Sequence, residues 1–100
     1  MPDKELLEEE LLREAADFFK ALGNDTRLQI IWCLSQGEKS SGQLAEAQEM
    51  TPSAISHQLT LLKQLKIVKV KEKGKTRLYQ LADDHISRIM QAVLENYQED

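Results

Sequence analysis

The spacing of apolar residues changes at about residue 66, and this change limits the folds open to the chain. Before it, apolar residues recur every three or four positions, as in amphipathic helices. After it, the runs IVKVKEKG and KTRLYQL are rich in branched or aromatic residues and break at Lys73-Gly74. They predict a two-stranded hairpin with its tip at residues 73–75.

Helices are expected on both sides of the hairpin. Four precede it, at about residues 4–22, 25–35, 41–48 and 52–64. Ser40 and Gln43 have the spacing of a capping box, and Thr51 before Pro52 is typical of an N-cap followed by the first helical residue. A last helix starts at Asp83, with an apolar stripe formed by Ile86, Ile89, Met90, Val93 and Tyr97.

The element order α-α-α-α-β-β-α, with short helices before one basic hairpin, predicts a mainly α winged helix-turn-helix with a two-stranded β wing. One hundred residues can bury one modest core, so a single domain is expected over residues 1–100. Within it, the helix-turn-helix is expected at 40–64 and the wing at 67–82.

The net charge of −4 conceals an uneven distribution. Residues 51–82 contain seven basic residues and one acid, Glu72, which gives that segment +6 and leaves −10 for the rest of the chain. Because a local patch rather than the net charge meets phosphate, the hairpin and the helix before it are candidates for nucleic-acid binding.

The fourth predicted helix has two distinct faces. At 100° per residue, Ile55, Leu59 and Leu62 fall on one side, and hydrogen-bonding residues without an acid fall on the other. A helix that reads base edges in a major groove needs such a polar face, with phosphate contacts beside it. The predicted DNA-binding residues are Thr51, Ser53, Ser56, His57, Thr60, Lys63, Gln64, Lys73, Lys75 and Arg77.

Several other classes of protein are disfavoured. No apolar run approaches the roughly 18–20 residues of a bilayer span. The start MPDKELLEEE is too acidic for a signal or transit peptide, so a cytoplasmic protein is expected. Cys33, the single cysteine, excludes a disulfide framework, and it is expected to project away from the buried arc formed by Leu28, Ile31 and Leu34. No nucleophile–base pair can be identified, so an enzyme is not expected.

Two segments together resemble the ArsR/SmtB family of repressors. FFKALGNDTRLQII resembles the family signature KALxDxTRLxIL through Lys20, Ala21, Leu22, Asp25, Thr26, Arg27 and Leu28. TPSAISHQLTLLKQLKIVKVKEKGKTRLYQL resembles its recognition helix and wing through Ser53, Ser56, His57, Gln58, Leu59, Leu62, Gly74 and Tyr79. The resemblance covers about residues 15–99 and is greatest to the CzrA-like zinc and cobalt sensors. It implies a homodimer joined by residues 1–22 and 83–100, which represses transcription at an inverted-repeat operator in double-stranded DNA.

The same resemblance permits a test for metal sites. The family's thiolate site uses a CVC motif, and Ser40, Ser41 and Gly42 stand at that position, so this site is absent. The site on the last helix has the pattern Asp-x-His, ten residues, then His-x-x-His or Glu. This chain supplies Asp83, His85, Asn96 and Glu99, with asparagine in place of the usual histidine.

His85 and Asn96 are eleven residues apart, about 16 Å along a helix, so one helix cannot close such a site. An antiparallel partner helix could, which gives one or two zinc ions per dimer, or cobalt or nickel in their place. Because a neutral amide is a poor zinc ligand, Asn96 should weaken binding.

The sequence is compatible with three alternatives. The acids can instead favour the start of the last helix, with His85 on the surface and Glu99 in an acidic tail. A repressor of this fold can respond to an oxidant, to a small molecule or to no signal. A protein-interaction module that docks a basic partner through the acidic first helix (Glu8, Glu9, Glu10 and Glu14) is the third.

Overall fold

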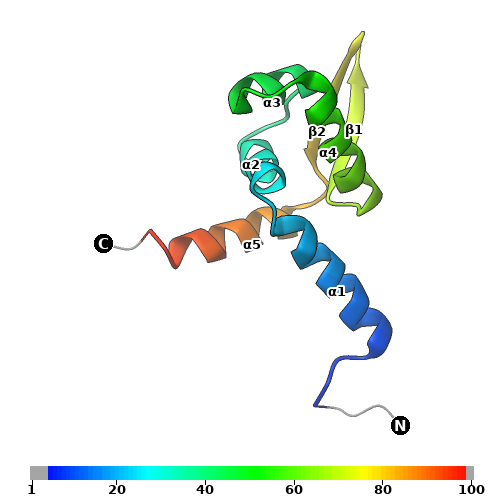
Figure 1. Ribbon diagram of the computed structural model, residues 1–100, viewed down its shortest axis with the longest axis vertical. Coiled ribbons are helices and arrows are strands. Elements are labelled where there is room, and N and C mark those ends of the chain that lie inside the picture. Colours follow the sequence, from blue (N-terminus) through cyan, green and yellow to red (C-terminus); the bar gives the residue numbers. More distant parts are fainter. Residues whose placement is uncertain (1–4, 99–100) are drawn as a thin grey trace.

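The computed structural model describes residues 5–98, and within that range it contains five helices and one two-stranded sheet (Figure 1). The elements in chain order are α1 (Glu9–Leu22), α2 (Asp25–Leu34), α3 (Ser41–Gln48), α4 (Pro52–Gln64), β1 (Val68–Lys73), β2 (Thr76–Leu81) and α5 (Asp84–Glu95). The body consists of α2, α3, α4 and the hairpin, while α1 and α5 extend from its base in different directions. The predicted winged helix-turn-helix is confirmed.

Side-chain caps determine where the helices of the body begin. Ser40 and Gln43 form the predicted capping box, with the Gln43 N–H donating to Ser40 Oγ (3.1 Å) and the Ser40 N–H to Gln43 Oε1 (2.9 Å). The Thr51 hydroxyl accepts from the Ala54 N–H at 3.2 Å, and proline occupies the first turn of α4. These local bonds explain why both starts were predictable to the residue.

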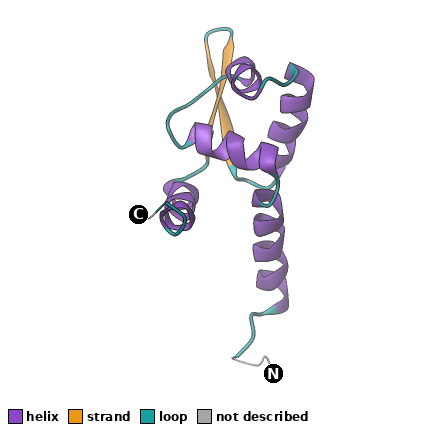
Figure 2. Ribbon diagram, turned by 60° about the vertical axis from the view of Figure 1, so that its left-hand side comes forward, coloured by secondary structure: helices purple, strands orange, loops and turns teal. Residues whose placement is uncertain are grey.

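Within the described residues, the hairpin is joined to the body by a single backbone bridge. β1 and β2 are antiparallel, with Lys73 opposite Thr76 at the tip. Gly74 in the turn has φ +66°, a conformation that glycine adopts without a Cβ clash. On the other side of β2, Lys39 forms an isolated antiparallel bridge with Tyr79. Figure 2 shows the hairpin standing beside the helices of the body.

The core lies between α2, α3, α4 and the base of the hairpin. Its fully buried large side chains are Ile30, Ile31, Leu44, Ile55, Leu59, Leu62, Ile67 and Val68. α5 adds Ile86 and Met90, and α1 adds Ala21 from its last turn. The earlier turns of α1 are exposed, so α1 gains little stability from this core. No described helix has the length and apolarity needed to span a membrane.

Three details differ from the sequence-based expectation. The first helix begins at Glu9 rather than near residue 4, and Glu8, its N-cap residue, makes no side-chain cap bond. Leu28 is 38% exposed rather than buried, and Ile30 occupies the core instead. Tyr97 lies beyond the end of α5 and is 79% exposed, so it does not continue the buried stripe. All three differences concern surfaces near the ends of α1, α2 and α5.

Candidate nucleic-acid interface

α4 exposes one polar face and buries the other. Ile55, Leu59 and Leu62 are at most 1% exposed, which confirms the predicted core side. The residues predicted to read DNA are all exposed: Ser53, Ser56, His57, Thr60 and Gln64. The hydroxyl of Thr60 donates to the Ser56 carbonyl at 2.9 Å, so these two polar residues are linked on the helix surface.

The turn between α3 and α4 sets the orientation of α4 relative to α3. The C-cap of α3 is Glu49, a non-glycine residue in the left-handed region (φ 53°, ψ 45°). The Met50 N–H then donates to the Ala45 carbonyl at 2.9 Å, and the Met50 side chain packs against the core. This tight connection is the predicted turn of the helix-turn-helix, and it holds the start of α4 in the open.

The wing carries its basic side chains in two different settings. Lys73 and Lys75 flank the turn and are exposed. Arg77 lies further down β2, where its guanidinium is 5.8 Å from the Tyr79 ring centroid and its Nε is 4.0 Å from Glu72 Oε2. Among the described residues neither tip lysine is in an ion pair, whereas Arg77 lies against the Tyr79 ring and near Glu72.

A recess of about 420 Å³ joins α4 to the wing. Its lining residues are Ser56, Leu59, Thr60, Lys63, Gln64, Arg77 and Tyr79. The structure thus brings five of the ten predicted DNA-binding residues together around one hollow, with a cation from each of the two elements. Hydroxyl groups, an amide and two cations around a surface hollow can donate hydrogen bonds to the phosphate oxygens of a nucleic acid.

The predicted metal ligands within the described residues lie at the two ends of α5. Asp83 caps the helix, because its Oδ1 accepts from the His85 N–H at 2.9 Å, and the same oxygen lies 3.2 Å from His85 Nδ1. Asn96 is the C-cap at the opposite end, and Glu99 lies outside the described residues. Within residues 5–98, no group of three His, Cys, Asp or Glu side chains is placed to hold a metal ion.

Arg27 is a structural residue whose contacts could not be predicted from the sequence pattern. Its side chain donates to two carbonyl groups of α1 and to the side chain of Gln58 on α4. Both residues occur in the segments that resemble known repressors, but their separation of 31 positions leaves no periodic signal of contact. Cys33, in contrast, is half-buried against the core and has no second cysteine in the chain.

Residues 24–70 match the sequence profile described as "Bacterial regulatory protein, arsR family". Among curated proteins, the chain is 34% identical over 87 residues to the "Transcriptional repressor SmtB homolog" of Synechocystis, with 87% of the chain covered. It spans 66% of that protein's length, just under two thirds. It is 33% identical over 84 residues to the regulator NmtR of Mycobacterium tuberculosis, covering 84% of the chain and 70% of NmtR.

A solved structure has a very similar fold. It is the winged helix-turn-helix domain of a possible ArsR-family regulator from Mycobacterium bovis, described as homodimeric and DNA-binding. The TM-score is 0.86 at 30% identity, and the alignment covers 99% of this chain and 89% of the other.

Proposed function

This chain belongs to the arsR family of bacterial regulatory proteins, and we propose that it is a homodimeric transcriptional repressor that binds an inverted-repeat operator. The observation that carries the proposal is the continuity between the exposed face of α4 and the basic wing. α4 offers short hydrogen-bonding side chains to base edges, and the wing offers cations to the flanking backbone. The family match agrees with a regulator rather than an enzyme.

α4 is the proposed recognition helix. Its first turn offers backbone N–H groups and the exposed Ser53, and the next turn offers Ser56 and His57. N-terminal residues of a recognition helix contact bases, so these side chains are assigned to sequence reading. Lys63, Lys73 and Lys75 are assigned to phosphate contacts, which fix position without reading sequence.

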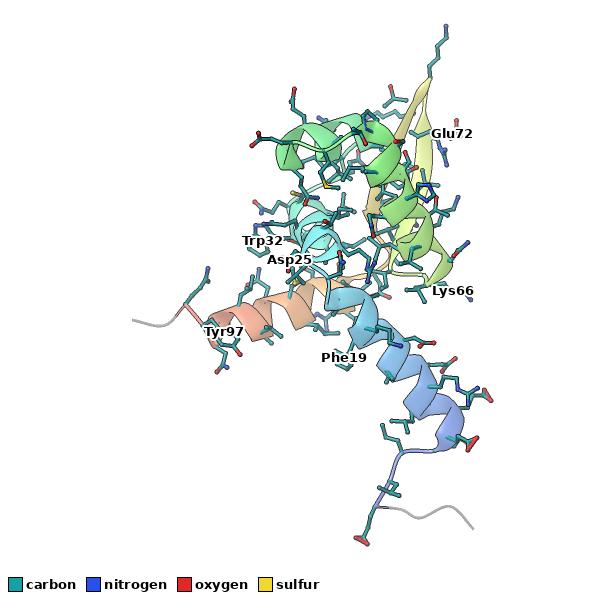
Figure 3. The ribbon with its side chains drawn as sticks, in the orientation of Figure 1. Phe19, Asp25, Trp32, Lys66, Glu72 and Tyr97 are labelled. Carbon is teal, nitrogen blue, oxygen red and sulfur yellow. The ribbon has the colours of Figure 1, made fainter. Side chains whose placement is uncertain are left out.

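The proposed dimer uses α1 and α5. Both helices expose apolar side chains, including Phe19 (61% exposed) on α1 and Val93 (51%) on α5. Figure 3 shows Phe19 on α1 and Tyr97 near the C-terminal end of α5, both outside the body. A groove of about 440 Å³ between α2 and α5 is lined by apolar side chains such as Trp32 and Met90, together with Asp25, Gln29 and Gln98. A second copy that covers these surfaces would remove a large apolar patch from water.

Metal control of the dimer is the finer part of the proposal. Asp83 and His85 supply a carboxylate and an imidazole side by side at the start of α5, both exposed and both suited to zinc. Glu99 of the second copy would be the third ligand, and Asn96 of that copy, or water in its place, would take the fourth position. A bound divalent metal such as zinc, cobalt or nickel would cross-link the two α5 helices and so alter the spacing of the α4 helices. Asn96 makes this site weaker than one with histidine.

Selection of duplexes from a random pool with the purified protein tests the proposed function. The expected product is an inverted repeat whose half-sites are centred about one helical turn apart, bound at least about 10³-fold more tightly than a scrambled duplex. Ser56→Asp, which places an acid on the polar face of α4, should abolish this binding. Gln91→Asp adds the same charge on the exposed side of α5 and should preserve it.

Recovery of no preferred sequence at low salt would contradict the proposal and favour a protein-interaction role for the acidic α1. Specific binding that zinc, cobalt and nickel leave unchanged would retain the repressor and remove the metal. An oxidant or a small-molecule inducer would then be screened.

A further inference from the structure

The side chain of Arg27 connects three helices. Arg27 lies in the first turn of α2, and its Nε and Nη2 donate to the carbonyl groups of Ala21 (2.8 Å) and Lys20 (3.4 Å) at the end of α1. Its Nη1 donates to Oε1 of Gln58 on α4 at 3.1 Å. A single guanidinium therefore contacts both the helix that projects from the body and the helix proposed to read DNA.

The acceptors suit this cation. The last carbonyl groups of a helix carry partial negative charge, so a guanidinium at the end of α1 is favourably placed. In the part of the chain that the structure describes, no carboxylate lies within ion-pair distance of Arg27. Its planar set of donors can bind acceptors on two elements at once, which a lysine ammonium on a flexible stem does poorly. The contact is half-buried, where charge-assisted hydrogen bonds are less exposed to water.

Gln58 links this contact to the orientation of α4. It directly follows His57, and successive residues of a helix point about 100° apart. His57 is exposed on the polar face, while Gln58 is half-buried and turned toward Arg27. A rotation of α4 about its own axis that moved His57 would therefore break the contact between Gln58 and Arg27.

We infer that Arg27 and Gln58 are positioning residues that hold α4 at a fixed orientation to α1, so that the geometry of the dimer determines the half-site spacing the protein accepts. The inference rests on the proposed function, in which α1 contacts a second copy and α4 reads DNA. α1 packs on α2, and Arg27 extends that contact to α4. A dimer with this link presents two recognition helices at one defined separation, and a dimer without it tolerates several.

The experiment measures discrimination between spacings. The probes are the inverted-repeat duplex selected with the wild-type protein and two derivatives with one base pair added or removed between the half-sites. One base pair turns a half-site by about 35°, since a helical turn has about 10–10.5 base pairs. The wild-type protein should bind the derivatives about tenfold more weakly than the parent duplex. In Gln58→Met, which keeps the size of the side chain but removes the acceptor, this ratio should fall to about threefold or less.

Arg27→Lys is the second test variant and should show the same relaxed discrimination. Gln58→Glu retains an acceptor for Arg27 and should keep the wild-type ratio, whatever its effect on overall DNA affinity. Gln48→Met is the matched control, because the Gln48 amide donates to the Thr26 carbonyl at 3.4 Å and joins α3 to α2 without involving α4. Sedimentation should give the same dimerisation constant for all of these variants.

Wild-type discrimination in dimeric Gln58→Met or Arg27→Lys would overturn the inference. An equal loss of discrimination in Gln48→Met would also overturn it, because general loosening of the body would then explain the effect. If the wild-type protein selects no duplex at all, the failure lies with the proposed function rather than with the positioning residues.

Discussion

Lys39 and Tyr79 exchange two backbone hydrogen bonds, with the Tyr79 N–H donating to the Lys39 carbonyl at 2.7 Å and the Lys39 N–H to the Tyr79 carbonyl at 3.0 Å. This pair joins the loop before α3 to the middle of β2. A two-stranded hairpin alone is marginal in water, so the wing depends on this third contact with the body. An ion pair between Lys71 and Glu38 (3.0 Å) lies beside it and is too exposed to contribute much.

Lys39→Pro should weaken the attachment of the wing. Proline removes the donated N–H and leaves the Tyr79 carbonyl without that partner. We expect the free energy of unfolding to fall by about 1–3 kcal/mol in urea titrations, the range for a lost hydrogen bond at a buried group. Lys39→Ala keeps the N–H and is the control. An equal loss in Lys39→Ala would mean that the lysine side chain, not the backbone bond, holds the wing.

His57→Ala should change which sequence the protein prefers. His57 is exposed in the second turn of α4, within reach of a base edge in the proposed complex. We expect a loss of about 1–3 kcal/mol on the selected duplex and a changed base preference at one position of each half-site. Competition binding with single-base variants of the duplex measures both effects. A loss of the same size on every duplex would contradict a base contact.

Lys75→Ala should weaken all duplexes alike. Lys75 stands at the wing tip and is assigned to phosphate, so its removal should reduce the slope of log affinity against log salt by about one for each subunit's lost contact. Fluorescence anisotropy at several salt concentrations gives this slope. Arg88→Ala removes the same charge from an exposed position on α5 and should leave the slope unchanged. A steeper loss on the selected duplex than on a scrambled one would assign Lys75 to sequence reading.

Val93→Asp should separate the dimer without unfolding the chain. Val93 is 51% exposed on α5, so a charge there costs the isolated chain little and the proposed interface much. Sedimentation equilibrium should show a shift toward monomer while the far-ultraviolet circular dichroism spectrum remains that of a folded helical protein. Gln91→Asp, also on α5 and exposed, is the control for charge alone. A dimer of wild-type stability in Val93→Asp would exclude this part of α5 from the interface.

Asn96→His should strengthen zinc binding. Imidazole replaces a poor amide donor at the C-cap of α5, and we expect the affinity measured by isothermal titration to rise by at least about tenfold. His85→Ala in the Asn96→His background should reverse the gain, because the two positions would contribute to one site between subunits. Equal zinc affinities of the wild-type and Asn96→His proteins would contradict the proposed ligand set.

The parts of the fold that short-range signals encode were predictable. Ser40 with Gln43, and Thr51 with Pro52, act within one helical turn, and both α3 and α4 begin where these residues predict. The polar face of α4 followed from helical periodicity in the same way. Asp83 is compatible with both interpretations of the sequence, as a residue that favours the start of the last helix and as a metal ligand. It caps α5 and also lies beside His85.

Longer-range relationships were not predictable for a physical reason. The contact between Arg27 and Gln58 depends on how three helices pack, and no periodicity of one segment encodes it. Leu28 has the spacing of a core residue but faces the groove between α2 and α5, which is lined by Met90 and Leu94. The burial of Leu28 depends on what covers that groove, so it is determined by assembly with a second copy rather than by the fold of one chain. The proposed metal ligands depend on assembly for the same reason.

The opposed charges of α1 and the wing have a consequence for the kinetics of encounter. Exposed acids such as Glu9 and Glu10 begin α1, and Lys73 and Lys75 mark the tip of the wing at the other end of a long axis of 52 Å (Figure 1). Such a molecule is an electric dipole, and the field of a polyanion exerts a torque on it before any atoms touch. Approach with the wing leading is thus favoured during diffusion, and added salt should slow association by removing this orientation as well as by weakening attraction.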